Sequence, residues 1–200
     1  MRLLGLDKDC FASWLAKIPE GSTMVVQPKV EGFAIGLRYK YGQLVEAYSR
    51  KGSEIIENIR TIKAIPLNID DSLKVEVELE GILYSSSFNS KFLQAQLLAS
   101  STTENASNTS LSFLAFRIFR SDSDELSDLT QLQNWGFEIP ITLRTDDPCQ
   151  VKRWHSQWIK KELFSNLPTN GIVAKCNASS TKSRLGFSQF SPNWALALTR

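Results

Sequence analysis

The sequence has few side chains that bind metals or form disulfides. It contains three cysteines, Cys10, Cys149 and Cys176, and one histidine, His155. The cysteines are widely separated, odd in number and form no CxxC pair, so the sequence offers no case for a zinc site. We expect free thiols in a reducing compartment, which favours a cytoplasmic location.

The chain also lacks a long apolar run and an excess of either charge. The N-terminal stretch MRLLGLD introduces charge too early for a signal peptide, and no segment approaches the length of a membrane span. Lys and Arg total 23 against 21 Asp and Glu, which leaves a formal charge of +2. This balance predicts no membrane partner and does not indicate nucleic-acid binding by charge alone.

What the chain does have is an apolar fraction of 42% and five tryptophans, which indicate a folded globular protein. Alternation of apolar and polar residues predicts strands at 23–29, 33–39, 44–49, 73–84, 111–119, 171–176 and 194–198. Helical spacing predicts helices at 7–17, 54–62, 126–135 and 151–163, and a Ser/Thr/Asn-rich loop is expected at 99–110. No long linker divides the chain, so we expect an α+β fold of mostly antiparallel strands with packed helices.

The run Gln-Pro-Lys-Val-Glu-Gly at residues 27–32 is the first with chemical content. Alternation puts Gln27, Lys29 and Glu31 on one face of a strand that Gly32 ends. The glycine permits a ligand phosphate to approach closely. A lysine acts as a nucleophile only after losing its proton, which requires its surroundings to lower its pKa from about 10.4. The spacing alone leaves open both a nucleophile and a solvated charge.

Several further runs follow in order along the chain. They are NIRTIKAIPL at 58–67, VEVELE at 75–80, LSFLAF at 111–116, NGIVAK at 170–175, and LGFS with SPNWALA within 185–197. With these runs, in order and over most of its length, the chain resembles the adenylation domain of NAD-dependent DNA ligases. Residues 27–32 stand where that family has its lysine-x-aspartate-glycine signature, and the run at 58–67 is the most specific match.

This resemblance implies a nucleotidyltransferase fold of the ATP-grasp-like ligase adenylation type, in one divergent domain spanning residues 1–200. It implies binding of an adenine nucleotide and self-adenylylation on Lys29, with NAD or ATP as donor and Mg²⁺ as cofactor, in nucleic-acid repair or joining such as DNA repair. Glu80 would accept hydrogen bonds from the ribose, and Lys175 would lie beside the adenine or its phosphate. The implied nucleotide-binding residues are Gln27, Glu31, Gly32, Arg50, Glu80, Phe116, Asn170 and Lys175.

Several positions depart from the family's pattern. Gln27 stands where the family has an acidic residue, and Glu31 and Asn170 each replace an aspartate. Thr199 takes the position of the lysine in the fifth motif, which would neutralise phosphate charge. Arg200 is adjacent, but strand alternation predicts that it points to the opposite face. These departures predict a weakened active site.

We also expect the flanking ligase modules to be absent, both the domain for the nicotinamide end of NAD before Asp7 and the oligonucleotide-binding barrel after Arg200. The expected partners are an adenine nucleotide and either a nucleic acid or a protein that supplies the missing modules. A second hypothesis therefore stays open, in which the chain is a non-catalytic descendant that senses nucleotides or binds proteins. A truncated product that folds poorly is a third.

Overall fold

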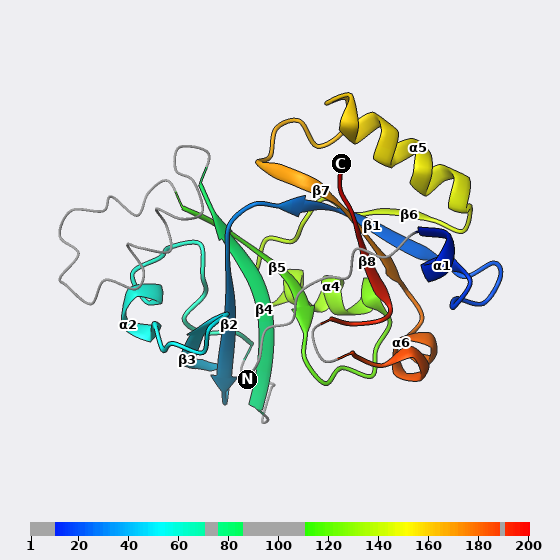
Figure 1. The fold of residues 1–200 in the computed structure, drawn as a ribbon. Helices are drawn as coiled ribbons and strands as arrows, with labels where there is room; N and C mark the ends of the chain where they lie inside the picture. The colour runs from blue at the N-terminus through cyan, green and yellow to red at the C-terminus, as the bar shows by residue number, and fades with distance from the viewer. Residues whose placement is uncertain (1–10, 71–75, 86–110, 189–190) are drawn as a thin grey trace. The chain divides into compact units, whose positions relative to one another are not determined.

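The computed structural model describes residues 11–70, 76–85, 111–188 and 191–200. The predicted loop at 99–110 and the predicted helical residues before Phe11 lie outside these ranges. The chain divides into two compact units, the first comprising Met1–Leu3, Glu31–Ser121 and Leu129–Ile139, and the second Leu4–Val30, Asp122–Asp128 and Pro140–Arg200. Each unit is built on one four-stranded sheet (Figure 1). The predicted α+β class is confirmed, and the single-domain organisation stays a prediction.

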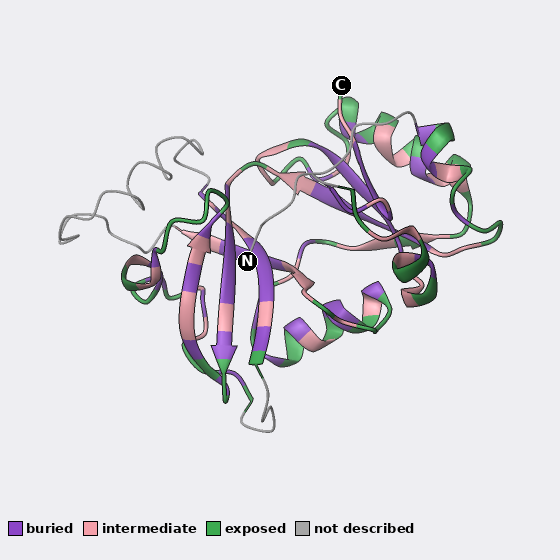
Figure 2. Ribbon diagram, turned by 60° about the horizontal axis from the view of Figure 1, so that its bottom comes forward, coloured by how far each residue is buried: buried purple, intermediate pink, exposed green. Residues whose placement is uncertain are grey.

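The first unit contains a sheet with the strand order β3-β2-β4-β5, in which every neighbouring pair is antiparallel. Its strands are β2 (Phe33–Lys40), β3 (Gln43–Ser49), β4 (Glu76–Tyr84) and β5 (Ser112–Ile118). These bounds agree closely with the predicted strands, because apolar and polar residues alternate along each of them. Figure 2 shows buried segments along these strands.

Aromatic side chains form the centre of the first unit. The rings of Tyr39 and Phe113 each lie 6.0 Å from the ring of Phe137, measured between centroids. The buried Tyr39 hydroxyl donates a hydrogen bond to the carbonyl of Pro66 at 2.6 Å. Burial raises the pKa of this hydroxyl well above its usual range, so the phenol stays neutral in the folded protein.

The second unit contains a sheet with the strand order β6-β1-β7-β8, also antiparallel throughout. Its strands are β1 (Met24–Val30), β6 (Leu143–Thr145), β7 (Thr169–Cys176) and β8 (Ala195–Leu198). Among its described residues, the helices that lie wholly within this unit are α1 (Phe11–Leu15), which contacts β8, α5 (Pro148–Ile159), which contacts β6 and β7, and α6 (Ser179–Leu185). The three-residue β6 and the polar α6 were not predicted, because neither shows apolar periodicity.

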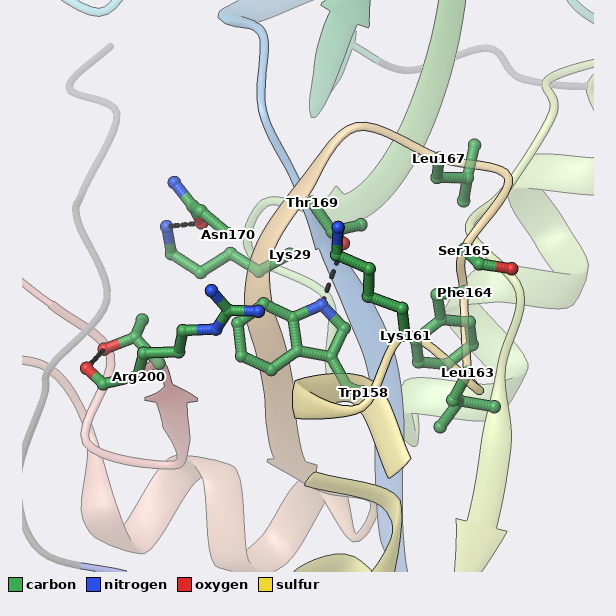
Figure 3. Close-up of a pocket in the computed structure, with 11 residues that line it drawn as sticks. Lys29, Trp158, Lys161, Leu163, Phe164, Ser165, Leu167, Thr169, Asn170 and Arg200 are labelled. Carbon is green, nitrogen blue, oxygen red and sulfur yellow. Dashed lines mark hydrogen bonds between the residues drawn. The ribbon is translucent and has the colours of Figure 1, made fainter. Parts of the chain in front are cut away.

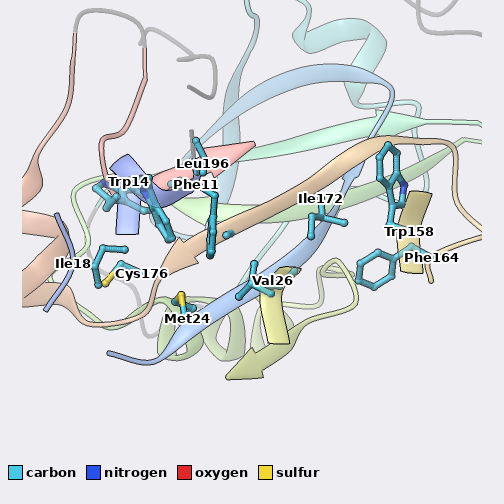
Figure 4. Close-up of a cluster of buried hydrophobic side chains, with 14 residues drawn as sticks. Phe11, Trp14, Ile18, Met24, Val26, Trp158, Phe164, Ile172, Cys176 and Leu196 are labelled. Carbon is cyan, nitrogen blue, oxygen red and sulfur yellow. The ribbon is translucent and has the colours of Figure 1, made fainter. Parts of the chain in front are cut away.

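A hydrophobic cluster forms the core of the second unit (Figure 4). It joins Met24 and Val26 of β1 to Ile172 of β7, and it includes Trp14 of α1 and Trp158 of α5. These β1 residues alternate with Val25 and Gln27, so the cluster lies on one face of the sheet.

Three predicted helices have different bounds in the structure. α5 begins earlier than the predicted 151–163, because Asp147 caps it by accepting a hydrogen bond from the Cys149 amide at 2.8 Å. α2 (Ile56–Ile59) covers only part of 54–62, because the chain continues in turns such as the Ile62 amide bond to the Ile59 carbonyl. α4 (Glu125–Asn134) ends just before Gly136 (φ 87°), close to the prediction, and the division between the units passes through it.

None of the helices in the described part of the chain is long and apolar enough to cross a membrane.

Candidate nucleotidyltransferase site

Lys29 lies near the end of β1, where the pairing with β7 is irregular. Pro28 pairs with Ile172 but Val30 pairs with Thr169, so two residues of β7 stand opposite Lys29. One of them is Asn170, whose side-chain oxygen accepts a hydrogen bond from the Lys29 amine at 2.6 Å. The structure therefore brings together two of the predicted site residues, which are far apart in the sequence.

The other residue of β7 opposite Lys29 is Gly171, and the structure shows why this position holds a glycine. A Cβ atom at Gly171 would lie 2.5 Å from the main-chain oxygen of Leu198 in β8. Only a residue without a side chain permits β8 to pair so closely at this point. The close approach of β8 therefore accounts for Gly171 without any ligand.

Lys29 and Asn170 line a pocket of about 660 Å³ whose described lining comes entirely from the second unit. Figure 3 shows Lys29, Lys161 and Arg200 around Trp158, which forms part of the lining. The remaining lining residues are Leu163, Phe164, Ser165, Leu167, Thr169 and Thr199. The described lining has three cationic side chains and no Asp or Glu, so the pocket suits an anionic ligand.

The placement of Arg200 corrects an expectation from the sequence. Alternation predicted that Thr199 and Arg200 point to opposite faces, yet both line this pocket. The reason is that β8 ends at Leu198, so the two residues lie beyond the strand and its alternation does not apply to them. His155 helps to hold the segment, since its Nε2 lies 3.1 Å from the Thr199 carbonyl oxygen.

Lys175 has different surroundings from Lys29, although the resemblance implied a shared pocket. Its amine donates a hydrogen bond to the Glu125 carboxylate at 2.6 Å, and the two side chains are only 6% and 3% exposed. Lys182 contacts both Glu125 and Asp128 at 3.3 Å, which extends the pair into a buried network. Lys175 is not among the described residues that line the pocket at Lys29.

Gln27 lies on the same sheet face as Lys175. It pairs with Val173 while Lys175 pairs with Val25, so the two are diagonal neighbours across β1 and β7. The buried Gln27 amide donates to the hydroxyl of Thr142 at 3.0 Å. The irregular pairing between Pro28 and Val30 puts its extra residue on β7, and β1 continues without interruption through Lys29.

The first unit holds the other predicted site residues. Glu80 of β4 is buried and accepts a hydrogen bond from Arg117 of β5 at 3.4 Å, and the two residues face each other in the ladder. Arg50 and Glu31 are exposed, next to β3 and β1 respectively, and Phe116 of β5 is half-buried. Their roles as nucleotide-binding residues stay predictions.

The structure requires a glycine at position 32 for a reason that the sequence did not reveal. A Cβ atom there would lie 2.3 Å from the main-chain oxygen of Leu83 in β4. The predicted reason was the approach of a ligand phosphate, whereas the close contact in the structure is with the protein backbone. The glycine is required for packing within the first unit whether or not a ligand binds.

The sequence reasoning missed Lys161, Trp158 and Phe164 as pocket residues. Trp158 was interpreted as part of the apolar face of a helix, and it does belong to the hydrophobic cluster. The one available signal was the lysine pair at 160–161, placed where a helix ends. In the described residues, no group of three or more His, Cys, Asp or Glu side chains is arranged to hold a metal ion. We therefore assign no step to the Mg²⁺ that the resemblance implied.

The arrangement of strands is that of ligase nucleotidyltransferase domains. The chain is similar to a solved Lig E DNA ligase (TM-score 0.64, 13% identical), with all of this chain and 69% of that chain covered. It is also similar to an archaeal ATP-dependent RNA ligase (TM-score 0.63, 11% identical), with 99% of this chain and 48% of that chain covered. At these identities the likeness establishes the fold class.

Sequence comparison defines the family. The profile of the NAD-dependent DNA ligase adenylation domain matches residues 5–110 and 88–199, and the chain belongs to that family. It is 31% identical to the DNA ligase of Staphylococcus saprophyticus over 199 residues, which cover 84% of this chain and 29% of that protein. It is 28% identical to the DNA ligase of Borrelia garinii over an alignment 227 residues long, which covers 98% of this chain and 34% of that protein. The chain thus spans about a third of the length of these curated relatives.

Proposed function

We propose that the chain binds an adenine nucleotide and accepts its adenylyl group on Lys29. The observation that carries this proposal is the position of the Lys29 amine, which lines a cation-rich pocket and is held by Asn170 at 2.6 Å. Family membership supports it, because Lys29 stands at the lysine of the family's adenylation signature.

The proposed step is a nucleophilic displacement at the α-phosphorus of the donor. The nitrogen lone pair of the deprotonated Lys29 amine forms the new N–P bond. The P–O bond to the leaving group breaks, and its electrons stay with nicotinamide mononucleotide if the donor is NAD, or with pyrophosphate if it is ATP. The amine proton passes to solvent. Asn170 orients the amine through a neutral oxygen, and the pocket's cations offset the negative charge of the phosphates.

Intact-mass spectrometry tests this proposal directly. The purified chain is incubated with NAD or with ATP, each with magnesium, and a family member known to be active is treated in parallel. We expect a mass increase of one adenylyl group with at least one donor. Lys29→Ala removes the nucleophile and abolishes the adduct, whereas Lys160→Ala, a neighbouring exposed lysine outside the pocket, leaves it intact. No adduct with either donor, while the active relative is labelled, would refute the proposal.

The buried pairing of Lys175 favours a second candidate function. A cation already neutralised by Glu125 at 2.6 Å contributes little to holding a nucleotide phosphate. This supports a non-catalytic descendant that senses nucleotides or binds a protein. Calorimetric nucleotide binding without an adduct would identify a sensor, and no binding at all would leave protein interaction.

Participation in nucleic-acid repair or joining forms the wider part of the proposal. The relatives that carry the name DNA ligase are about three times longer than the part this chain matches. Nick sealing would therefore involve modules beyond the part that is matched here. A nick-sealing assay of the chain alone, and then with candidate partners, measures this requirement.

A further inference from the structure

A second pocket lies in the second unit, at the opposite end of β1 from Lys29. Its volume is about 710 Å³, within the range of ligand-binding cavities, and all of its described lining belongs to this unit. Met24, the first residue of β1, lines it. Figure 4 shows Ile18 and Met24, which line this pocket, at one end of the hydrophobic cluster, and Trp158, which lines the pocket at Lys29, at the other end. The two pockets share none of their described lining residues.

Helix α1 and the turn after it form an apolar side of this pocket. Trp14 of α1 packs into the hydrophobic cluster, whereas Ala12 and Ala16, one helical turn apart, line the pocket. The Ala16 amide donates to the Ala12 carbonyl at 3.0 Å, so the helical turn continues past the end of α1. These two side chains are single methyl groups and occupy little of the space beside the helix. The rest of the apolar lining consists of Leu15, Ile18, Pro19, Met24 and Pro148.

Three carboxylates from two distant parts of the chain also line the pocket. Glu20 lies between α1 and β1, Asp146 and Asp147 lie between β6 and α5, and all three residues are exposed. Asp147 is fixed in position, because its carboxylate accepts from the Cys149 amide at 2.8 Å and its own amide donates to the Thr145 hydroxyl at 3.0 Å. Within the described part of the chain, none of the three carboxylates forms an ion pair.

Cations occur on neighbouring segments but do not line this pocket. Arg184 donates to the Lys17 carbonyl at 2.8 Å, and the Lys152 ammonium lies 6.0 Å from the centroid of the Phe11 ring. The described lining contains no Lys, Arg or His side chain. Three carboxylates in such a lining create a negative potential, which repels the phosphates of nucleotides, nucleic acids and anionic lipids. The pocket therefore favours a cationic ligand.

We propose that this pocket binds a segment of a partner protein in which an arginine or a lysine stands between apolar residues. Such a side chain has an apolar stem and a charged end. The stem packs on the apolar lining, and the charged end forms charge-assisted hydrogen bonds with the exposed carboxylates. The apolar neighbours of the cation are buried against the remaining lining. Charge complementarity thus selects this occupant over a nucleic acid and over an uncharged apolar segment.

An NMR titration with short peptides tests the proposal. The chain has two methionines, Met1 and Met24, so methionine methyl labelling gives two signals, and Met24→Leu identifies the one at the pocket. The probe is N-acetyl-leucyl-arginyl-leucinamide, and its matched control carries citrulline, which keeps the shape of arginine without its charge. We expect a saturable shift of the Met24 signal with the arginine peptide. The citrulline peptide should bind at least about fivefold more weakly, because it loses the attraction of the carboxylates.

Removing the carboxylates tests the other partner. Asp147→Asn removes a charge but keeps a cap on α5, since asparagine and aspartate cap helices equally well. Combined with Glu20→Gln and Asp146→Asn, it should weaken binding of the arginine peptide by about fivefold or more and change binding of the citrulline peptide by less than about twofold. Glu162→Gln, at an exposed acidic residue outside the described lining, is the control and should change binding by less than about twofold.

The proposal is overturned if the arginine peptide leaves the Met24 signal unchanged, or if the citrulline peptide binds as tightly. It is also overturned if Glu162→Gln weakens binding as much as the triple variant does. If the triple variant fails to fold, the two peptides still decide the question on the unmodified chain. Sedimentation tests a different occupant, since a dimer that is lost in Asp147→Asn would assign the pocket to a second copy of the chain and not to a partner protein. None of these measurements involves a nucleotide or Lys29, so their outcome is independent of the adenylylation proposal.

Discussion

Lys29 and Lys175 lie on neighbouring strands of one sheet, and both stand in motifs of the same family, yet their surroundings differ. Lys29 is half-buried at a pocket and is held by the neutral side chain of Asn170. Lys175 is buried and is held by the carboxylate of Glu125 at 2.6 Å. The first arrangement keeps a cationic amine at a cavity, and the second neutralises it inside the protein.

This difference teaches that a motif position does not by itself define a role. A buried ion pair contributes little net stability, but it becomes costly when one partner is removed. An exposed polar contact at the rim of a pocket contributes little to stability. Substitution of Lys175 should therefore lower the stability of the protein. Substitution of Lys29 should leave its stability nearly unchanged and abolish the proposed adduct.

The largest expected effect comes from breaking the buried pair. Glu125→Gln removes the carboxylate that Lys175 and Lys182 share, so we expect a loss of about 3–5 kcal/mol in the free energy of unfolding. Urea denaturation measures it. The double variant Lys175→Met with Glu125→Leu should recover most of the loss, because it leaves no uncompensated charge and Lys182 keeps Asp128. A single variant as stable as the unmodified chain would mean that the pair is not formed.

The next largest loss of stability is expected at Gly32. This residue is close to Lys29 in the sequence, but packing within the first unit requires a glycine there. Gly32→Ala places a methyl group against the Leu83 carbonyl, and we expect a loss of about 1–3 kcal/mol. Thermal unfolding without any nucleotide measures it. Gly52→Ala is the comparison: Gly52 has φ 86° with no atom near its added methyl, so only backbone strain of about 1–2 kcal/mol applies. Unchanged stability in Gly32→Ala would instead favour the ligand-approach explanation for this glycine.

The buried hydroxyl of Tyr39 is neutral, in contrast to the buried ion pair of Lys175 and Glu125. Tyr39→Phe removes the hydrogen bond to Pro66, and we expect a loss of about 1–2 kcal/mol at neutral pH. The raised pKa of Tyr39 adds a pH dependence. The unfolded chain loses this proton near pH 10 while the folded chain keeps it, so stability falls as pH rises beyond about 10.

Unfolding of Tyr39→Phe and of the unmodified chain between pH 7 and 11 checks this sign. The difference between them should shrink above pH 10, because the variant lacks the tyrosine's proton. The buried thiol of Cys176 also has a raised pKa, mainly from burial, and it lowers stability above about pH 9 in both proteins alike. A difference that grows with pH would contradict the assignment.

The smallest effect on stability is expected at Lys29 itself. Lys29→Met should change the free energy of unfolding by less than about 0.5 kcal/mol, because the bond to Asn170 is exposed and involves a neutral partner. Chemical denaturation in parallel with Lys175→Met, which breaks the buried pair, provides the direct contrast. A Lys29→Met variant destabilised as strongly as Lys175→Met would remove the distinction between the two lysines.

Much of the fold could be predicted because it depends on local patterns. Alternation located β2, β3 and β5 to within a few residues, and Gly136 marked the end of α4. The three-residue β6 could not be predicted, since its residues form a strand only by pairing with Met24–Val26 of β1. Apolar periodicity placed the start of α5 at residue 151, whereas in the structure the cap at Asp147 starts the helix at Pro148.

Some residues of the candidate site could likewise be predicted from the sequence, and others could not. Motif order pointed to Lys29 and Asn170, and the structure brings their side chains together. The burial of Lys175 against Glu125, 50 positions away, has no local signature. Arg200 was assigned to the wrong face because the end of β8 at Leu198 depends on its partner strand.

The sequence by itself determined the α+β class, the order of most strands along the chain, the family, and the position of Lys29 at the end of a strand. Only the tertiary structure decided which cations are neutralised and which line a pocket. The physical reason is that an ion pair needs its partner within about 4 Å and shielded from water. For Lys175 that partner comes from α4, whereas for Lys29, Lys161 and Arg200 the described pocket lining contains no Asp or Glu side chain.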